Sequence, residues 1–411
     1  MFLPKVFQFG LVPAVVFAAI VSWINNRWAP PQTTIHLWAR VNLKARNYCS
    51  CHNLLLQTCM ALAFVALMLF VTGRNGPIHG PDSGERFKVS QQILDGTTIW
   101  EATSSGHRLS PLLPVVVAAM HAWLRTSFET STQLVNTFIF AANMLLILNI
   151  VLMSTRNYFL SYMAVLTVFL SAHFRLIHLQ TGEEPLYIFT VLCSLLFTLR
   201  FIRDQKSSDL VLATFFASAS PFARRAGMLT IISFYIVLVC CWKQYKLGWR
   251  VLALPILFAS APMAIFSIGR RFAGQEVILC CGETVGWDIF HTKMWIAFEN
   301  STRHFTKYFY WDDYRSILPL LAYTIFLLVI LISMARSLRR GIVDFQITCH
   351  YFHLVQFFGF VLIGALIAWE VPAHEDSRML SPAFSVAIPS IFLTIHRFFP
   401  SPLLKLRRNV V

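Results

Sequence analysis

Apolar residues along the chain are grouped in long runs, and short polar segments separate these runs. A helix needs roughly 20 apolar residues to cross the hydrocarbon core of a bilayer. Runs of this kind predict about eleven membrane-spanning helices, at approximately residues 7–24, 53–72, 132–153, 158–173, 187–202, 210–222, 227–242, 251–268, 317–335, 347–371 and 381–398. The segment 111–124 is shorter and marked by proline, and we interpret it as a helix lying in the membrane interface. The pattern predicts an all-α, polytopic membrane protein.

The composition supports this prediction. Of the 411 residues 56% are hydrophobic and only 13% are charged, which excludes an ordinary soluble globular protein. The nine cysteines form no CxxC pair and have no histidine at zinc spacing. We therefore expect neither a disulfide framework nor a zinc site.

The formal net charge is +15. Basic residues of a membrane chain first serve topology and contacts with lipid headgroups, so we expect membrane lipids and no nucleic acid as partners. The basic short loops that begin at residues 27, 203, 243, 336 and 405 alternate along the chain and are predicted to be cytoplasmic. All nineteen acidic residues except Asp204, Asp209 and Asp344 then lie on the outer face. This asymmetry indicates chemistry or recognition on that face.

Two outer segments carry clustered acids. Asp82 and Glu85 lie in "HGPDSGERFKVSQQILDG", directly after the predicted span 53–72. Such a carboxylate is either a solvated loop charge or a group placed where a lipid-borne substrate presents its headgroup. In "RLIHLQTGEEPLYIF", Glu183 and Glu184 precede a proline that begins a helix, and capping would explain an acid there. Two carboxylates beside His178 exceed what a cap requires.

Two further outer segments carry arginines. Arg224 and Arg225 interrupt the apolar stretch 210–242, and each would cost roughly 2.5–3.5 kcal/mol in mid-membrane. They therefore mark a turn near the outer surface, where they anchor to headgroups or bind a phosphate, which the guanidinium fork holds in a bidentate manner. In "WEVPAHEDSRMLSPAF", Glu375, Asp376 and Arg378 share one outer turn, and this arginine is suited to an anionic headgroup.

This series of segments resembles the GT-C superfamily of membrane glycosyltransferases, which use polyprenyl-phosphate sugars, and in particular its branch of aminoarabinose transferases and protein-mannosyltransferase-like enzymes. The matching features are an Asp after an early helix followed by "VSQQILDG", then "SPLLPVV", "GEEPLYIF", "FARRAG" and "EDSRMLSPAF", in the family's order over residues 53–400. The resemblance implies a GT-C-like transmembrane catalytic domain at 53–400 with interfacial helices in its first outer loop. An N-terminal helix and basic cytoplasmic loop at 1–52 would precede it, and a basic cytoplasmic tail at 401–411 would follow.

The resemblance also implies roles for residues. Asp82 would be the catalytic base, Arg224 or Arg225 would hold the phosphate together with Arg378, and Glu184 would orient hydroxyl groups. The family's turn has one basic residue before Pro or Gly-Pro, whereas this chain has two followed by Ala-Gly, so which arginine acts stays open. The other candidate substrate-binding residues are Glu85, His178, Glu183, Glu375 and Asp376.

The function implied is inverting transfer of a sugar from a polyprenyl-phosphate donor to a lipid, glycan or protein acceptor at the outer membrane face, in a bacterial inner membrane rather than the endoplasmic reticulum. No cofactor is expected, although Asp82, Glu183 and Asp312 leave a divalent metal open. One alternative is an O-antigen polymerase-like or ligase-like enzyme. The other is a transporter or flippase without chemistry. The working residues of the polymerase alternative would be Arg270, Arg271, Arg303 and His304.

Overall fold

The computed structural model describes part of the chain, and the predicted N-terminal helix 7–24 and the tail 401–411 lie outside that part. The described residues are 55–74, 76, 78–79, 83–103, 110–245, 249–272, 287–306, 308, 317–366, 378 and 380–398. Within these ranges the backbone is helical almost throughout and forms no β-strand. Every predicted span other than 7–24 overlaps a helix, and the all-α class is confirmed for this part of the chain.

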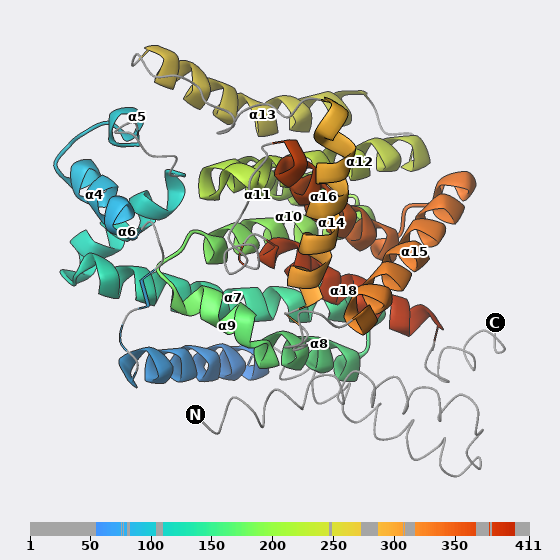
Figure 1. Ribbon diagram of the computed structural model, residues 1–411, viewed down its shortest axis with the longest axis horizontal. Coiled ribbons are helices and arrows are strands. Elements are labelled where there is room, and N and C mark those ends of the chain that lie inside the picture. The colour runs from blue at the N-terminus through green and yellow to red at the C-terminus, as the bar shows by residue number, and fades with distance from the viewer. Residues whose placement is uncertain are drawn as a thin grey trace, which may run out of the picture.

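The helices follow one another along the chain in the order shown in Figure 1. They are Leu55–Arg74, α4 (Ser83–Leu94), α5 (Ile99–Ala102), α6 (Leu112–Leu124), α7 (Phe128–Thr155), α8 (Tyr158–Leu170), α9 (Ala172–Leu179), α10 (Glu184–Asp204), α11 (Ser207–Ala223), the 3-10 turn η1 (Arg225–Gly227), α12 (Met228–Tyr245), α13 (Trp249–Phe272), α14 (Trp287–Thr306), α15 (Ile317–Arg340), α16 (Phe345–Leu366) and α18 (Ser381–Phe398).

Six helices among the described residues are long and apolar enough to cross a bilayer, or seven if the pair α8 and α9, bent by 65°, forms one span. The six are Leu55–Arg74, α7, α10, α12, α15 and α16. The protein is therefore a multi-pass membrane protein. The segment 111–124, predicted to be an interfacial helix, is the helix α6, which is too short to belong to this group.

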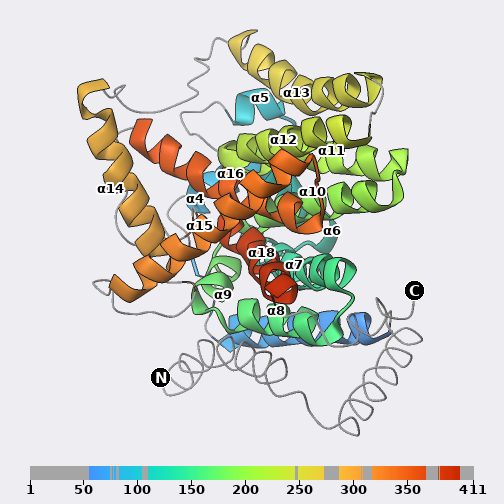
Figure 2. The same cartoon turned by 90° about the vertical axis from the view of Figure 1, so that its right-hand side faces the viewer.

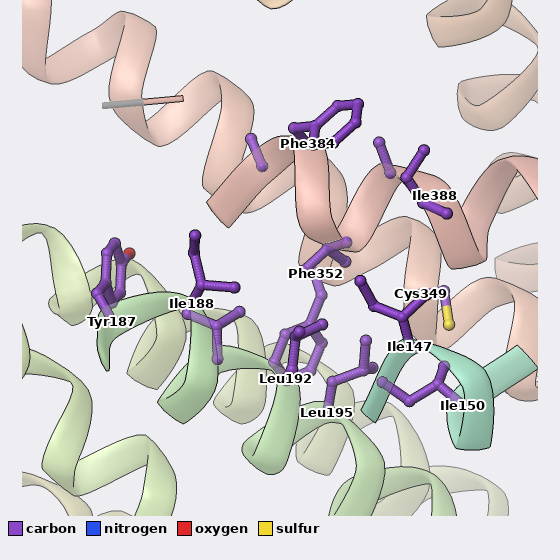
Figure 3. Close-up of a cluster of buried hydrophobic side chains, with 14 of the residues drawn as sticks. Ile147, Ile150, Tyr187, Ile188, Leu192, Leu195, Cys349, Phe352, Phe384 and Ile388 are labelled. Carbon is purple, nitrogen blue, oxygen red and sulfur yellow. The ribbon is translucent and has the colours of Figure 1, made fainter. Parts of the chain in front are cut away.

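α10 is the central helix of the bundle. Inside its apolar window 78% of the residues are buried, against 6% for Leu55–Arg74 at the edge. α10 packs along α11 and α7, while α16 packs against α18, α14 and α12. Ile188 and Leu192 of α10 meet Ile147 of α7, Phe352 of α16 and Phe384 of α18 in the core (Figure 3). This core holds the ends of these helices in fixed relative positions.

The chain breaks between helices follow from local chemistry. Ser171 ends α8 and also begins α9, where its Oγ accepts a hydrogen bond from the Phe174 amide at 3.3 Å. Between α11 and α12 the chain turns within η1. A Cβ on Gly227 would lie 2.1 Å from the carbonyl carbon of Ser220, so only glycine fits this close approach. The turn places two arginines at its start.

Most helices of the bundle begin at one end of it and finish at the other, so that their ends form two groups. A pocket of about 620 Å³ is lined by Ser154, Arg203, Gln244, Asp344 and Arg397, which come from the ends of α7, α10, α12, α16 and α18. We call this end of the bundle the basic end, because the loops here are the ones that the sequence predicts to be cytoplasmic. The start of α10, the turn η1 and the start of α18 belong to the opposite end.

The helix α14 lies outside every predicted span. It occupies residues 287–306, between the predicted spans 251–268 and 317–335. Figure 2 shows α14 on one flank of the bundle, where it packs against α16. Met294, Ala297 and Phe298 lie one turn apart and contact the core, and the Phe298 ring centroid lies 6.1 Å from that of Phe357. A search for membrane spans misses this helix, because its core contacts come from a few apolar residues at helical spacing in a polar stretch.

Candidate functional site

The segment before α4 and the loop between α9 and α10 are joined. Ile78 and Gln180 form a parallel β-bridge, and the Thr181 amide donates to the Ile78 carbonyl at 3.1 Å. At the start of α4, Ser83 Oγ lies 2.5 Å from Thr181 Oγ1. Asp82 lies outside the described residues, but it is the chain neighbour of Ser83. The two acid-bearing segments of the sequence are thus attached to each other.

Arg86 of α4 is buried at this junction, with 5% of its surface exposed. Its Nη1 donates to the Thr181 carbonyl at 2.8 Å, and its Nε lies 3.6 Å from Glu183 Oε1. The sequence analysis did not select this arginine. Ser83, Arg86 and Ser90, spaced i, i+3 and i+7, are the buried polar side chains of α4. The two serines on the same helix face as Arg86 are the sequence signal that would have identified this arginine as buried.

Glu183 is a buried carboxyl that capping does not explain. It precedes α10 in the N-cap position, yet its side chain makes no capping hydrogen bond. Instead Glu183 Oε1 accepts a hydrogen bond from the Ser110 amide at 3.2 Å. Burial raises the pKa of the Glu183 carboxyl above its ordinary value, against the opposing charges of Arg86 and Arg224. This group is therefore the one in the site that protonates most readily.

Glu184 pairs with two arginines that are distant in the sequence. Its Oε1 lies 2.6 Å from Arg224 Nη1 and 3.9 Å from Arg378 Nη1. The side chains of Arg224 and Arg378 are only 14% and 12% exposed. Three of the four predicted segments thus meet at one point. Of the two consecutive arginines, Arg224 is the one for which the structure shows an ion pair with Glu184.

The turn that bears Arg224 and Arg225 is attached to two core helices. The Tyr187 hydroxyl of α10 lies 2.9 Å from the Ala226 carbonyl oxygen and 2.7 Å from Gln356 Oε1 of α16. Tyr187 lies at the border of the apolar core in Figure 3. The arginines are therefore held by rigid elements, which favours a preorganised site.

His178 supports the loop from behind. It is buried against Phe140 and Phe174, whose ring centroids lie 5.1 and 4.4 Å from that of the imidazole. His178 Nδ1 lies 2.8 Å from the Phe174 carbonyl oxygen and therefore donates, which leaves Nε2 to accept from Asn143 Nδ2 at 3.0 Å. Both ring nitrogens are thus engaged inside the protein. This arrangement favours a structural role over the substrate contact that the sequence predicted.

Tyr308 is a second site residue that the sequence analysis did not select. It is buried, its ring stacks on Phe384 at 4.4 Å, and its hydroxyl is hydrogen-bonded to Ser381 near Arg378. The Glu184 carboxylate is close enough to interact electrostatically with the Tyr308 hydroxyl. Nothing in the aromatic-rich segment around it distinguishes this tyrosine from its neighbours, so its position is information that only the fold supplies.

Most of the remaining predicted residues lie outside the described part of the chain. Glu375 and Asp376 lie outside it, as does Asp82, while Glu85 is partly exposed on α4. Within the described ranges no three His, Cys, Asp or Glu side chains are grouped as metal ligands. Two members of the candidate metal set, Asp82 and Asp312, are outside those ranges.

We call the five residues Arg86, Glu183, Glu184, Arg224 and Arg378 the arginine–glutamate cluster. Three guanidiniums surround two carboxyls, so the positive charge exceeds the negative charge by one even with both acids ionised. Inside a protein this excess attracts an anion more strongly than it would in water. Guanidinium groups bind phosphate oxygens in pairs. The cluster is chemically suited to a phosphate group.

No protein-family model matches the chain, and no curated protein is similar to it.

The raised pKa of Glu183 predicts a pH-dependent stability. Because the folded protein holds this proton more tightly than the unfolded chain does, its contribution is fully present below the ordinary carboxyl pKa of 4.5 and is lost as pH rises toward the folded-state pKa. Glu183→Gln removes this titration and keeps an oxygen for the Ser110 amide. We expect the midpoint of thermal unfolding of the variant to rise relative to that of wild type as pH is raised from about 4 to about 8.

Glu85→Gln is the matched control, because it changes a partly exposed carboxyl on the adjacent helix. It should change the unfolding temperature less than Glu183→Gln does. If the Glu183→Gln difference does not vary with pH, the Glu183 carboxyl has the same pKa in the folded and unfolded states and its raised pKa is wrong.

Proposed function

We propose that the protein is an inverting glycosyltransferase with a GT-C-like fold of about eleven membrane-spanning helices, which transfers a sugar from a polyprenyl-phosphate donor to a hydroxyl of a lipid, glycan or protein. The observation that carries the proposal is the arginine–glutamate cluster. It brings three guanidiniums and two carboxyls from four distant chain segments together at one end of the helix bundle. A site at a helix end is where a lipid-linked phosphate would lie when its tail is in the membrane.

The donor phosphate is assigned to the arginines. In the proposed reaction the bond between the sugar C1 and the phosphate oxygen breaks, and the polyprenyl phosphate leaves as an anion. Arg224 and Arg378 would stabilise the charge that develops on the leaving oxygen. Because Glu184 lies against both guanidiniums, we assign it the role of positioning them, in place of direct contact with sugar hydroxyls.

The acceptor hydroxyl is assigned to Asp82. This carboxylate would take the proton as the acceptor oxygen forms its bond to C1 on the face opposite the leaving phosphate, which inverts the configuration. The attachment of Ser83 and Arg86 to the loop that carries Glu183 supports this role, since it brings the start of α4 to the cluster.

The two alternatives receive less support. In the polymerase-like reading Arg303 would work, but its Nη2 lies 2.8 Å from Glu299 one turn earlier in α14, which partly neutralises it. The transporter reading has one observation in its favour, the buried polar side chains His350, His353 and Gln356 on α16. His353 Nε2, however, lies 3.0 Å from the Tyr323 hydroxyl, as expected for hydrogen bonds that fix helix packing.

The test is transfer of label by the detergent-purified full chain. It is incubated with a panel of radiolabelled polyprenyl-phosphate sugars and a membrane lipid extract, and the products are separated by phase partition and chromatography. We expect one donor to lose its label to an acceptor fraction, with release of polyprenyl phosphate. If every donor keeps its label while the protein moves the same lipids between the leaflets of vesicles, the protein is a flippase and the proposal is wrong.

A further inference from the structure

A second pocket lies at the basic end of the bundle, far along the helices from the arginine–glutamate cluster. Its volume is about 380 Å³, and α15, the segment after it, and α16 and α18 line it. The lining residues are Val329, Ile332, Ser333, Arg336, Ser337, Arg340, Ile342, Asp344, Gln346 and Arg397. Neither the proposed transferase reaction nor the resemblance assigns a role to this pocket.

The pocket changes from apolar to cationic along α15. Val329, Ile332 and Ser333 line one end of the pocket, and Arg336 and Arg340 line the other end, which we call its basic mouth, near the end of the helix. Eleven residues of helix separate the first from the last of these positions, a distance of roughly 16 Å. A pocket with an apolar end and a basic mouth matches the polarity of a phospholipid, whose acyl chains lie below a charged phosphate.

The charges at the mouth favour an anion. Arg336, Arg340 and Arg397 face one acid, Asp344, whose Oδ1 accepts a hydrogen bond from the Ile347 amide at 2.8 Å and so caps α16. Arg397 Nη1 donates to Gln346 Oε1 at 2.9 Å, which holds this guanidinium beside the pocket. The three cations come from two different helices and converge on one space.

The outer surface of α15 is a lipid-facing surface. Only 22% of its apolar window is buried, against 72% for the neighbouring α16. Leu328, Leu331 and Ile332 are 52%, 44% and 51% exposed, respectively. In a multi-pass membrane protein such a surface contacts acyl chains. A lipid bound along α15 would therefore present its phosphate directly to the basic mouth.

We propose that this pocket binds the headgroup of an anionic phospholipid from the adjacent leaflet, with the acyl chains lying along α15. Arg336, Arg340 and Arg397 contact the phosphate, and Ser333, one turn before Arg336 on α15, binds another of its oxygens. This site lies at the opposite end of the bundle from the arginine–glutamate cluster, so the inference is independent of the glycosyltransferase proposal.

The test is native mass spectrometry of the full chain released from detergent micelles. In two arms the micelles contain phosphatidylglycerol or phosphatidylcholine, and in the third arm soluble glycerol phosphate is added to the solution. Phosphatidylglycerol should remain bound, phosphatidylcholine should not, and the double variant Arg336→Gln/Arg340→Gln should bind phosphatidylglycerol about 30-fold more weakly. The matched control is Arg339→Gln, an exposed arginine between these two that does not line the pocket, and its affinity should stay within about twofold of wild type.

The lysine double variant Arg336→Lys/Arg340→Lys keeps the charge and should keep most of the binding, which separates loss of charge from loss of fold. The proposal is overturned if phosphatidylcholine binds as well as phosphatidylglycerol, if Arg339→Gln weakens binding as much as the double variant, or if soluble glycerol phosphate binds as tightly as the lipid. The last result would identify a site for a free anion.

Discussion

Arg224→Gln is expected to lower the free energy of unfolding by about 3–5 kcal/mol, because it leaves the Glu184 carboxylate buried without its nearest countercharge. Arg224 Nη1 lies 2.6 Å from Glu184 Oε1, and the two side chains are only 14% and 4% exposed. Arg378, at 3.9 Å, offers partial compensation, which places the expected loss at the lower part of this range. Denaturant unfolding of the protein in detergent, followed by tryptophan fluorescence, measures the loss.

The matched control is Arg203→Gln. Arg203 Nε lies 2.7 Å from Asp204 Oδ1, nearly the same separation, but this arginine is 43% exposed. Solvent screening makes such a surface pair contribute little to stability, so Arg203→Gln should cost far less than Arg224→Gln. Equal losses in the two variants would show that Glu184 and Arg224 are not a desolvated pair.

The double variant Glu184→Gln/Arg224→Gln separates stability from function. With both charges of the pair removed, no unpaired carboxylate stays buried, so most of the stability lost in Arg224→Gln should return. Sugar transfer should not return, because the guanidinium that the proposal assigns to the phosphate is still missing. Recovery of transfer together with stability would mean that Arg224 serves the fold alone.

Much of the fold was predictable because membrane-spanning helices need long apolar runs that a single sequence displays. The runs 187–202 and 317–335 both coincide with helices, α10 and α15. α14 was not predicted, because its core contacts come from a few residues spaced one turn apart in a polar stretch. The bend between α8 and α9 at Ser171 was also missed, since a serine inside an apolar run looks like part of a continuous helix.

The candidate site was predicted in part. Glu183, Glu184 and Arg224 attract notice because charges at the edge of an apolar run are costly unless they are paired. Arg86 and Tyr308 did not attract notice, because each lies in a segment whose polar or aromatic neighbours look alike. Which side chains meet depends on contacts between distant segments, and a single sequence does not display those contacts. His178 shows the reverse case, a plausible ligand whose ring nitrogens are already engaged by Asn143 and its own helix.

Asp82→Asn is expected to lower kcat for sugar transfer by about 10²–10⁴-fold, the range that a positioned general base contributes. Asparagine keeps the size of the side chain and its ability to accept a hydrogen bond, but it does not take a proton at neutral pH. KM for the polyprenyl-phosphate donor should change little, because the proposal assigns the phosphate to Arg224 and Arg378. Initial rates at varied donor concentration separate the two effects.

Asp95→Asn is the control from the other end of the same segment. Asp95 is exposed directly after α4, and its Oδ1 accepts a hydrogen bond from Gln91 Nε2 at 2.8 Å, so its loss should leave kcat within about twofold. A polymerase-like enzyme that works through Arg303 and His304 would tolerate Asp82→Asn equally well. Near-normal transfer by Asp82→Asn would therefore remove the base from the proposed mechanism, whereas a selective loss of kcat would connect the start of α4 to the chemistry at the arginine–glutamate cluster.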